Sequence, residues 1–174
     1  SSGDGLEICL LPRLCPLSQI VQYVEENPVL AVAIDAQLTS SIDDENGFRS
    51  SDMQLRSLLP SEYRTWVASQ NSLMAVPLRG KQLAEAVSPL VGTVIETHPR
   101  ACIYLANPNA NYELVGNYKK PDYVNSIIKL MEWWMDEFNI KYHQHVRHTD
   151  GALDSVICAT IAFLYHNNPD KLLK

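Results

Sequence analysis

The chain has 174 residues, 46% of them hydrophobic, and a formal net charge of −6, which predicts one domain over residues 1–174 with enough apolar side chains for a core. The acidic balance argues against a broad basic face for nucleic acid, although it leaves room for a local basic patch. No apolar run approaches the roughly 18–20 residues that cross a bilayer, and residues 1–11 lack the features of a signal peptide, so we expect no membrane contact.

The first half of the sequence predicts short strands and helices in alternation. A strand is expected at 6–11, a helix at 16–27 and a second strand at 28–35. The second strand, "PVLAVAID", is continuously aliphatic and β-branched, which is typical of a strand buried on both faces of a parallel sheet. The polar stretch 36–51 is long enough for a functional loop. Residues 52–70 are predicted to be helical in pieces.

The second half continues the alternation and ends in two longer helices. A helix is expected at 80–91, a strand at 92–99, an amphipathic helix at 122–140 and a final helix at about 150–166. Helical spacing favours Trp134 as a core residue over a platform that stacks on bases. Strands that alternate with helices predict an α/β domain around a parallel or mixed sheet.

Two carboxylates close the predicted buried strands. Asp35 follows the apolar run "VLAVAI", and Glu96 follows "TVI". Ligands of open α/β sheets bind beyond the carboxyl ends of the strands, so both acids are placed for chemistry. A structural alternative stays open, in which Asp35 begins a turn and Glu96 caps the helix that follows Pro99.

The last predicted helix carries Asp150 and Asp154, which share a face because they are one turn apart. The helix dipole is enough to explain Asp150. Asp154 stands among apolar residues, where a carboxylate is costly unless it is paired or binds a metal. Acids that converge raise one another's pKa values, and a divalent cation relieves that repulsion. An all-oxygen site suits Mg²⁺ or Mn²⁺, which serve phosphoryl transfer in nucleases and phosphatases.

Several motifs occur in a recognisable order over residues 29–166: "AIDAQL", "GFRSSDMQLR", "VPLRG", "VIETHPRACIYL", "YKK" and "TDGALDSVICATIA". The ordered set resembles a family of predicted RNase H-like nucleases, domain of unknown function 429. The resemblance implies a central mixed sheet flanked by helices, with an acidic metal site. It matches Asp35 to a strand acid, Asp154 to the acid of the last helix and Glu96 to an E-x-x-P motif. The catalytic and metal-binding residues that we expect are Asp35, Glu96, Asp154 and Asp150.

Arg49 and Arg56 match an R-x-x-D-x-x-x-R motif of the same family. Guanidinium groups grip phosphate oxygens through two hydrogen bonds, so the two arginines are candidates for substrate binding. The alternative, which stays open, is that they pair with Asp52 and its neighbours and staple a loop. Lys119 of "YKK" is a further substrate-binding candidate that rests on the resemblance.

The family normally opens with a strand that carries a G-x-D acid, followed by a hairpin partner. This sequence begins near what would be the third strand, so we expect the N-terminal strands to be missing from it. The sheet would then have an unpaired edge. A second copy of the chain could cover that edge, which makes a homodimer conceivable.

Three hypotheses about function follow. The leading one is a divalent-metal-dependent nuclease that cleaves RNA, DNA or a hybrid. The second is a non-catalytic RNase H-like module for binding or assembly, and the third is a metal-dependent phosphatase for a small phosphorylated metabolite. The four cysteines form no CxxC pair, which favours reduced thiols and a cytoplasmic protein.

Overall fold

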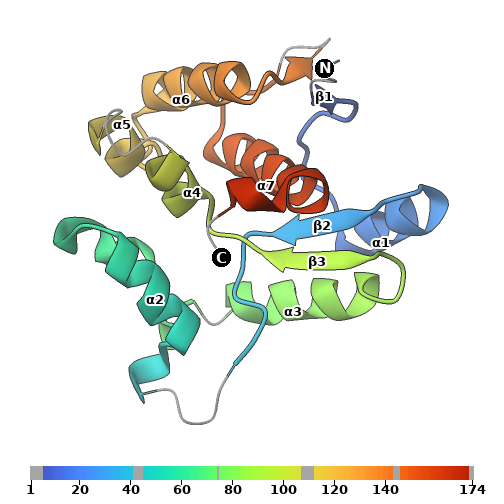
Figure 1. Cartoon of the computed structure of the whole chain (residues 1–174), viewed down its shortest axis with the longest axis horizontal. Helices are drawn as coiled ribbons and strands as arrows, with labels where there is room; N and C mark the ends of the chain where they lie inside the picture. Colours follow the sequence, from blue (N-terminus) through green and yellow to red (C-terminus); the bar gives the residue numbers. More distant parts are fainter. Residues whose placement is uncertain (1–5, 41–44, 74, 107–111, 143–145, 173–174) are drawn as a thin grey trace. The chain divides into compact units, whose positions relative to one another are not determined.

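A computed structural model describes residues 6–40, 45–73, 75–106, 112–142 and 146–172 (Figure 1). Helices predominate, and the strands form two small parallel pairs, so the chain is a mixed α/β protein. The chain divides into two compact units. The central unit is Cys15–Ala101, and the terminal unit combines Ser1–Leu14 with Cys102–Lys174. No helix in the described ranges has the length and apolar character that a membrane span requires.

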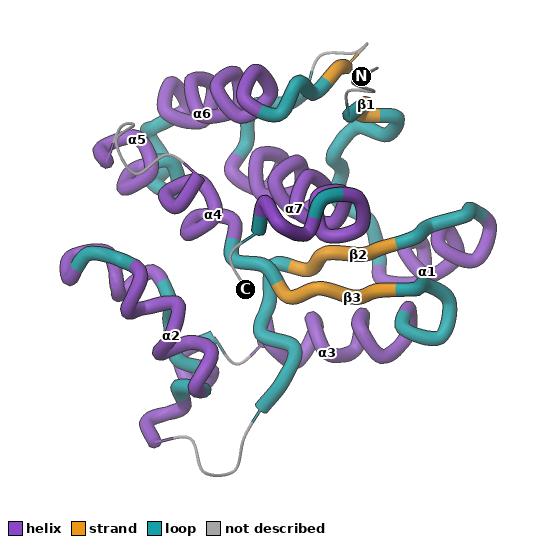
Figure 2. The backbone as a smooth tube through the Cα atoms, viewed as in Figure 1, coloured by secondary structure: helices purple, strands orange, loops and turns teal. Residues whose placement is uncertain are grey.

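The central unit alternates helices with two strands. Its elements are α1 (Leu17–Glu26), β2 (Ala31–Ile34), the 3-10 helix Glu45–Gly47, α2 (Ser50–Leu58), the 3-10 helices Ser61–Trp66 and Gln70–Ser72, α3 (Ala75–Val87) and β3 (Thr93–Glu96). Helix α1 contacts α3. The two strands run side by side in parallel (Figure 2), as the alternation of strands and helices predicted.

The register of β2 and β3 brings the two predicted strand acids to one edge. Ala31 pairs with Thr93, and Ile34 pairs with Glu96. Beyond this last pair, the N–H of Thr97 donates to the carbonyl of Ile34 at 2.9 Å. Asp35 is therefore one residue past the register partner of Glu96.

Strand β2 is shorter and less buried than its apolar sequence predicted. It covers four residues of the expected 28–35, and only Ile34 among them is fully buried. Ala31, Val32 and Ala33 are half-buried. The prediction of a strand covered on both faces is thus only partly realised within the described residues.

Helix α3 begins before the predicted start at Gly80 and carries that glycine in its interior. A Cβ atom at Gly80 would overlap the Cβ of Ala36, and it would also lie 3.4 Å from the Leu38 side chain. The helix can approach the segment after β2 only because position 80 has no side chain. Gly80 is therefore a packing residue inside the helix, five residues after its first residue.

The terminal unit is mainly helical. Its elements are β1 (Glu7–Ile8), α5 (Tyr112–Asn117), α6 (Val124–Glu137), β4 (Lys141–Tyr142), α7 (Asp150–Asn167) and the 3-10 helix Pro169–Lys171. Strands β1 and β4 are parallel, and α6 packs against α5 and α7. Helix α4 (Pro99–Ala106) begins in the central unit and ends in this one.

Helices α6 and α7 form the core of the terminal unit. Trp134 is buried, as predicted, and its Nε1 donates to Thr160 Oγ1 at 3.0 Å. Thr160 in turn donates to the carbonyl of Val156 at 2.8 Å. Leu153 and Ile157 are fully enclosed. The helical periodicity of residues 122–140 therefore placed Trp134 correctly in the core.

Candidate functional site

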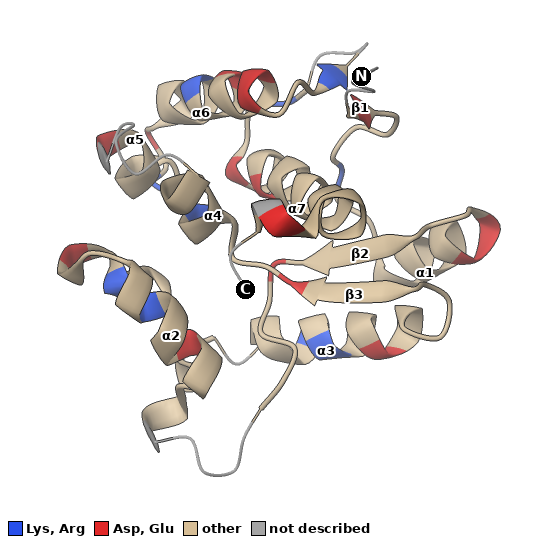
Figure 3. Cartoon of the chain, viewed as in Figure 1, with Lys and Arg blue, Asp and Glu red and all other residues tan. Residues whose placement is uncertain are grey.

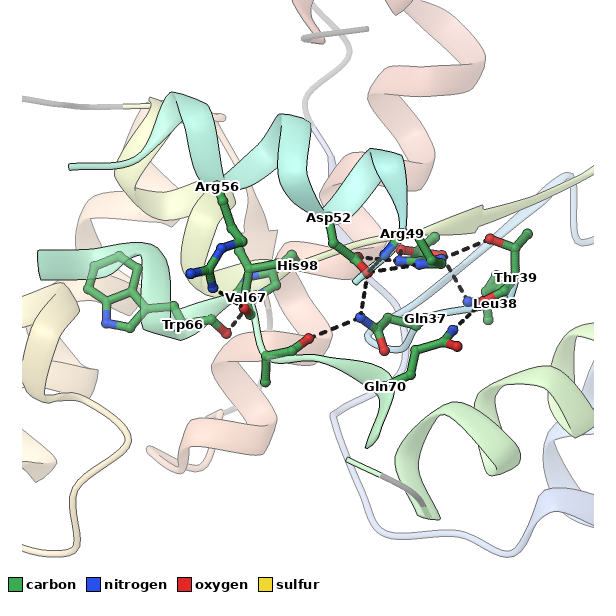
Figure 4. A network of polar contacts seen from close by, with 12 residues as sticks. Gln37, Leu38, Thr39, Arg49, Asp52, Arg56, Trp66, Val67, Gln70 and His98 are labelled. Carbon is green, nitrogen blue, oxygen red and sulfur yellow. Dashed lines mark hydrogen bonds and ion pairs between the residues drawn. The ribbon is translucent and has the colours of Figure 1, made fainter. Parts of the chain in front are cut away.

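The carboxylate of Glu96 is held by the guanidinium of Arg49. Arg49 Nη2 donates to Oε1 at 2.5 Å, and Nη1 donates to Oε2 at 2.8 Å. Figure 4 shows the Arg49 side chain between those of Asp52 and Thr39. The backbone N–H of Leu38 donates to the same Oε2 at 2.8 Å. The end of β3, the segment after β2 and the start of α2 are thereby joined at one carboxylate.

Arg49 also forms hydrogen bonds with Asp52, and the two residues together cap the start of α2. Its Nη2 lies 2.5 Å from Asp52 Oδ1, and its Nε lies 3.0 Å from Oδ2. The backbone N–H of Arg49 adds a bond of 2.9 Å to Oδ2, as the acidic partner in a capping box does. Both residues are only 4% exposed. The pair of Arg49 and Asp52, which was the structural alternative for the R-x-x-D spacing, is therefore present.

Gln37 extends this network on its buried side. Its Nε2 donates to Asp52 Oδ2 and to the carbonyl of Ala68, both at 3.1 Å. Both partners are acceptors, so the amide orientation is well determined. Gln37 Oε1 has no hydrogen-bond partner among the described residues.

Ion pairing in the network favours the charged forms of Arg49 and Asp52. Hydrogen bonds to Glu96 and then Asp52 raise the pKa of Arg49 against the opposing effect of burial. Burial works to raise the pKa of Asp52, but its bonds with Arg49 outweigh that effect and lower the pKa below its usual range. At neutral pH the charged guanidinium of Arg49 is therefore bonded to an ionised Asp52.

Arg56 is engaged with the backbone of its own unit. Its Nη1 donates to the carbonyl of Arg64 at 2.6 Å and to the carbonyl of Val67 at 2.8 Å. The guanidinium carbon lies 4.6 Å from the ring centre of Phe48. These contacts hold the segment after α2 in place. Binding of substrate by Arg56 stays a prediction.

His98 caps the start of α4, a role that sequence reasoning did not assign. The N–H of Ala101 donates to His98 Nδ1 at 3.2 Å. Because Nδ1 accepts, Nε2 carries the proton and donates to the carbonyl of Trp66 at 3.0 Å. The position of the histidine just before Pro99, the first helical residue, was the available signal.

Asp154 has two partners in the terminal unit. Tyr118 donates its hydroxyl to Oδ1 at 2.8 Å, and Lys119 Nζ lies 2.7 Å from Oδ2. Asp154 is only 8% exposed. The buried carboxylate thus meets the requirement for a partner through side chains of this chain.

Asp150 is exposed and stands at the first position of α7. The Thr149 side chain, which precedes it, accepts from the N–H of Ala152 at 3.1 Å and caps the helix. The placement agrees with the explanation of Asp150 by the helix dipole.

The four predicted acids lie two in each unit. Asp35 and Glu96 belong to the central unit, while Asp150 and Asp154 belong to the terminal unit. Acidic residues mark the carboxyl ends of both β2 and β3 (Figure 3). Across the described ranges, no group of three or more histidine, cysteine, aspartate and glutamate side chains is arranged to hold a metal.

The carboxylate of Glu96 has capacity for one further ligand. Glu96 accepts three hydrogen bonds, from Arg49 and Leu38, out of about four that a carboxylate can accept.

Comparisons of the chain with family models, with curated proteins and with solved structures found no match.

Proposed function

We propose that this protein is a divalent-metal-dependent phosphodiester hydrolase, a nuclease of RNase H-like type. The carrying observation is that Glu96 is the last residue of β3 and that Asp35 follows the last residue of the neighbouring parallel strand β2. Ligands of α/β sheets bind at such strand ends. The order of the sequence motifs supports the RNase H-like assignment.

Asp35 and Glu96 would hold the metal through carboxylate oxygens. Asp35 is exposed, and the Glu96 side chain is 34% exposed, so solvent reaches both. Mg²⁺ is often bound through one or two carboxylates, with water and substrate phosphate completing its coordination. When bound, the ion supplies a nucleophilic water and a Lewis acid for phosphoryl transfer.

The residues around Glu96 hold its carboxylate in a fixed orientation before an ion binds. Arg49 and the N–H of Leu38 fix the position of both oxygens. Asp52 accepts hydrogen bonds from Arg49, and Gln37 donates to Asp52. A carboxylate that is already oriented loses little conformational entropy when it binds an ion.

The test measures cleavage of labelled RNA, DNA and hybrid oligonucleotides with Mg²⁺, with Mn²⁺ and with EDTA. The wild type should cleave at least one substrate only with metal. D35N and E96Q should lower the rate by about a hundredfold or more. The control E85Q changes an exposed glutamate of α3 and should cleave like the wild type. A wild type inactive on every substrate, or an E96Q of full activity, refutes the proposal.

A second candidate is a non-catalytic module for binding or assembly. The observation in its favour is that the guanidinium of Arg49 already neutralises Glu96. Such a module would bind neither Mg²⁺ nor Mn²⁺ in calorimetry. Binding of Mn²⁺ that D35N or E96Q abolishes would exclude it. A parallel assay with phosphate monoesters separates a small-metabolite phosphatase from a nuclease.

A further inference from the structure

Asp154 has partners of its own in the terminal unit, although the family resemblance implies that this carboxylate binds metal together with Glu96. The Tyr118 hydroxyl donates to Asp154 Oδ1 at 2.8 Å, and the Lys119 ammonium lies 2.7 Å from Oδ2. Tyr118 and Lys119 directly follow α5, whereas Asp154 belongs to α7. The carboxylate therefore joins two segments of the terminal unit that are 35 residues apart in the sequence.

Burial distinguishes Asp154 from the acids of the central unit. The Asp154 side chain is 11% exposed, whereas the Glu96 side chain is 34% exposed and Asp35 is exposed. Mg²⁺ gives up its waters reluctantly and usually keeps several of them in its octahedral shell. A carboxylate with so little access to solvent is poorly placed to share an ion with those waters. Asp35 and Glu96 are therefore better suited than Asp154 to a hydrated ion.

Charge also disfavours a metal at Asp154. The ammonium of Lys119 already places a positive charge at Oδ2. A divalent ion on the same carboxylate would lie close to that ammonium, and the two positive charges would repel each other. Among the described residues, no group of three or more histidine, cysteine, aspartate and glutamate side chains is arranged around Asp154 to hold such an ion. A metal could bind there only if the ion pair were broken.

We propose that the hydrolase binds a single divalent ion through Asp35 and Glu96, and that Asp154 is a structural carboxylate whose counter-ion is Lys119. Many nucleases and phosphatases instead use two ions, about 3.5–4 Å apart. The number of ions rests on the proposed function, whereas the structural role of Asp154 does not. Loss of either partner would leave a largely buried charge uncompensated, so the pair holds the segment after α5 against α7.

The first experiment counts bound Mn²⁺ by titrating the full-length protein and measuring free Mn²⁺ by electron paramagnetic resonance. The wild type should bind one ion per chain. E96Q should weaken this binding by about tenfold or more, and D154N should stay within roughly twofold of the wild type. K119M removes the ammonium and leaves the Asp154 carboxylate in place, and it should gain no second ion.

The second experiment tests the ion pair without metal, by thermal melting of K119M, D154N and the double variant in EDTA. Each single variant should lower the melting temperature by about 5 °C or more, because it leaves one charge of the pair uncompensated. The double variant has neither charge, so it should melt clearly above the temperature that the sum of the two single shifts predicts. D136N and K120M change exposed residues of the same unit and should melt within about 2 °C of the wild type.

Two ions in the wild type would overturn the proposal, and so would a folded D154N whose Mn²⁺ affinity falls by about tenfold. A second ion in K119M, or additive melting shifts in the double variant, would overturn the structural role of Asp154. If D154N does not fold, the ion count of K119M decides that role. A wild type that binds no Mn²⁺ refutes the hydrolase and its single ion together, and the melting shifts then still decide the role of Asp154.

Discussion

Arg49 and Glu96 form a two-point ion pair, with contacts of 2.5 and 2.8 Å, although 47 residues separate them in the sequence. The same guanidinium also bonds Asp52, which belongs to the cap of α2. Arg49 is therefore the link between the start of a helix and the end of a strand. Its planar group of five donors makes this geometry possible.

R49K should destabilise the central unit. A lysine ammonium cannot form parallel bonds with two carboxylates, so at least one buried acid loses its partner. We expect a loss of about 2–4 kcal/mol in the free energy of unfolding. Urea denaturation followed by circular dichroism measures it.

The matched control is R79K, which changes an exposed arginine of α3. Its unfolding free energy should lie within about 0.5 kcal/mol of the wild type. Equal stabilities for R49K and R79K would show that the Arg49 network contributes nothing to folding.

The carboxylate of Asp52 should contribute stability that depends on pH. Burial opposes ionisation, but the bonds with Arg49 outweigh it and lower the pKa in the folded state. The stabilisation is therefore present above the unfolded pKa and is lost as the pH falls through the folded pKa. The stability gap between wild type and D52N should be largest near neutral pH and should narrow below about pH 4. Denaturation at a series of pH values tests this, and a gap that stays constant would contradict it.

G80A should destabilise the protein, although the same change in an open helix usually stabilises. Alanine at an open helical position gains up to about 1 kcal/mol over glycine. At position 80 the new Cβ would overlap Ala36, so we expect a loss of about 1–3 kcal/mol. G116A is the control, because among the described residues no atom outside its chain neighbours and its own helix backbone lies within 4 Å of a Cβ there. Melting temperatures that rise for both variants would refute the packing role of Gly80.

T160V should cost about 1–2 kcal/mol, because the buried indole N–H of Trp134 loses its acceptor. In a W134F background the same change should cost much less. A double-mutant cycle by urea denaturation measures this coupling. An equal cost in both backgrounds would show that the 3.0 Å bond between Trp134 and Thr160 carries no energy.

The helices of the terminal unit were predictable because their signal is local. Apolar residues at helical spacing gave α6 and α7 nearly their observed bounds, and the same pattern placed Trp134 in the core. The parallel pairing of β2 and β3 also followed from the alternation of strands with helices. Element bounds were less predictable where packing decides them. Helix α3 extends through Gly80, where Ala36 leaves no room for a Cβ atom.

The sequence by itself determined the α/β class, the long amphipathic helices and the acids at the ends of β2 and β3, because each depends on residues close together along the chain. Only the tertiary structure decided which positively charged side chain pairs with each acidic residue. Spacing suggested a pair for Arg49 and Asp52, which are three residues apart, but it could not reveal the bond between Arg49 and Glu96 or between Lys119 and Asp154. Partners of this kind are selected by distance in space and by desolvation, and neither is encoded in a local pattern.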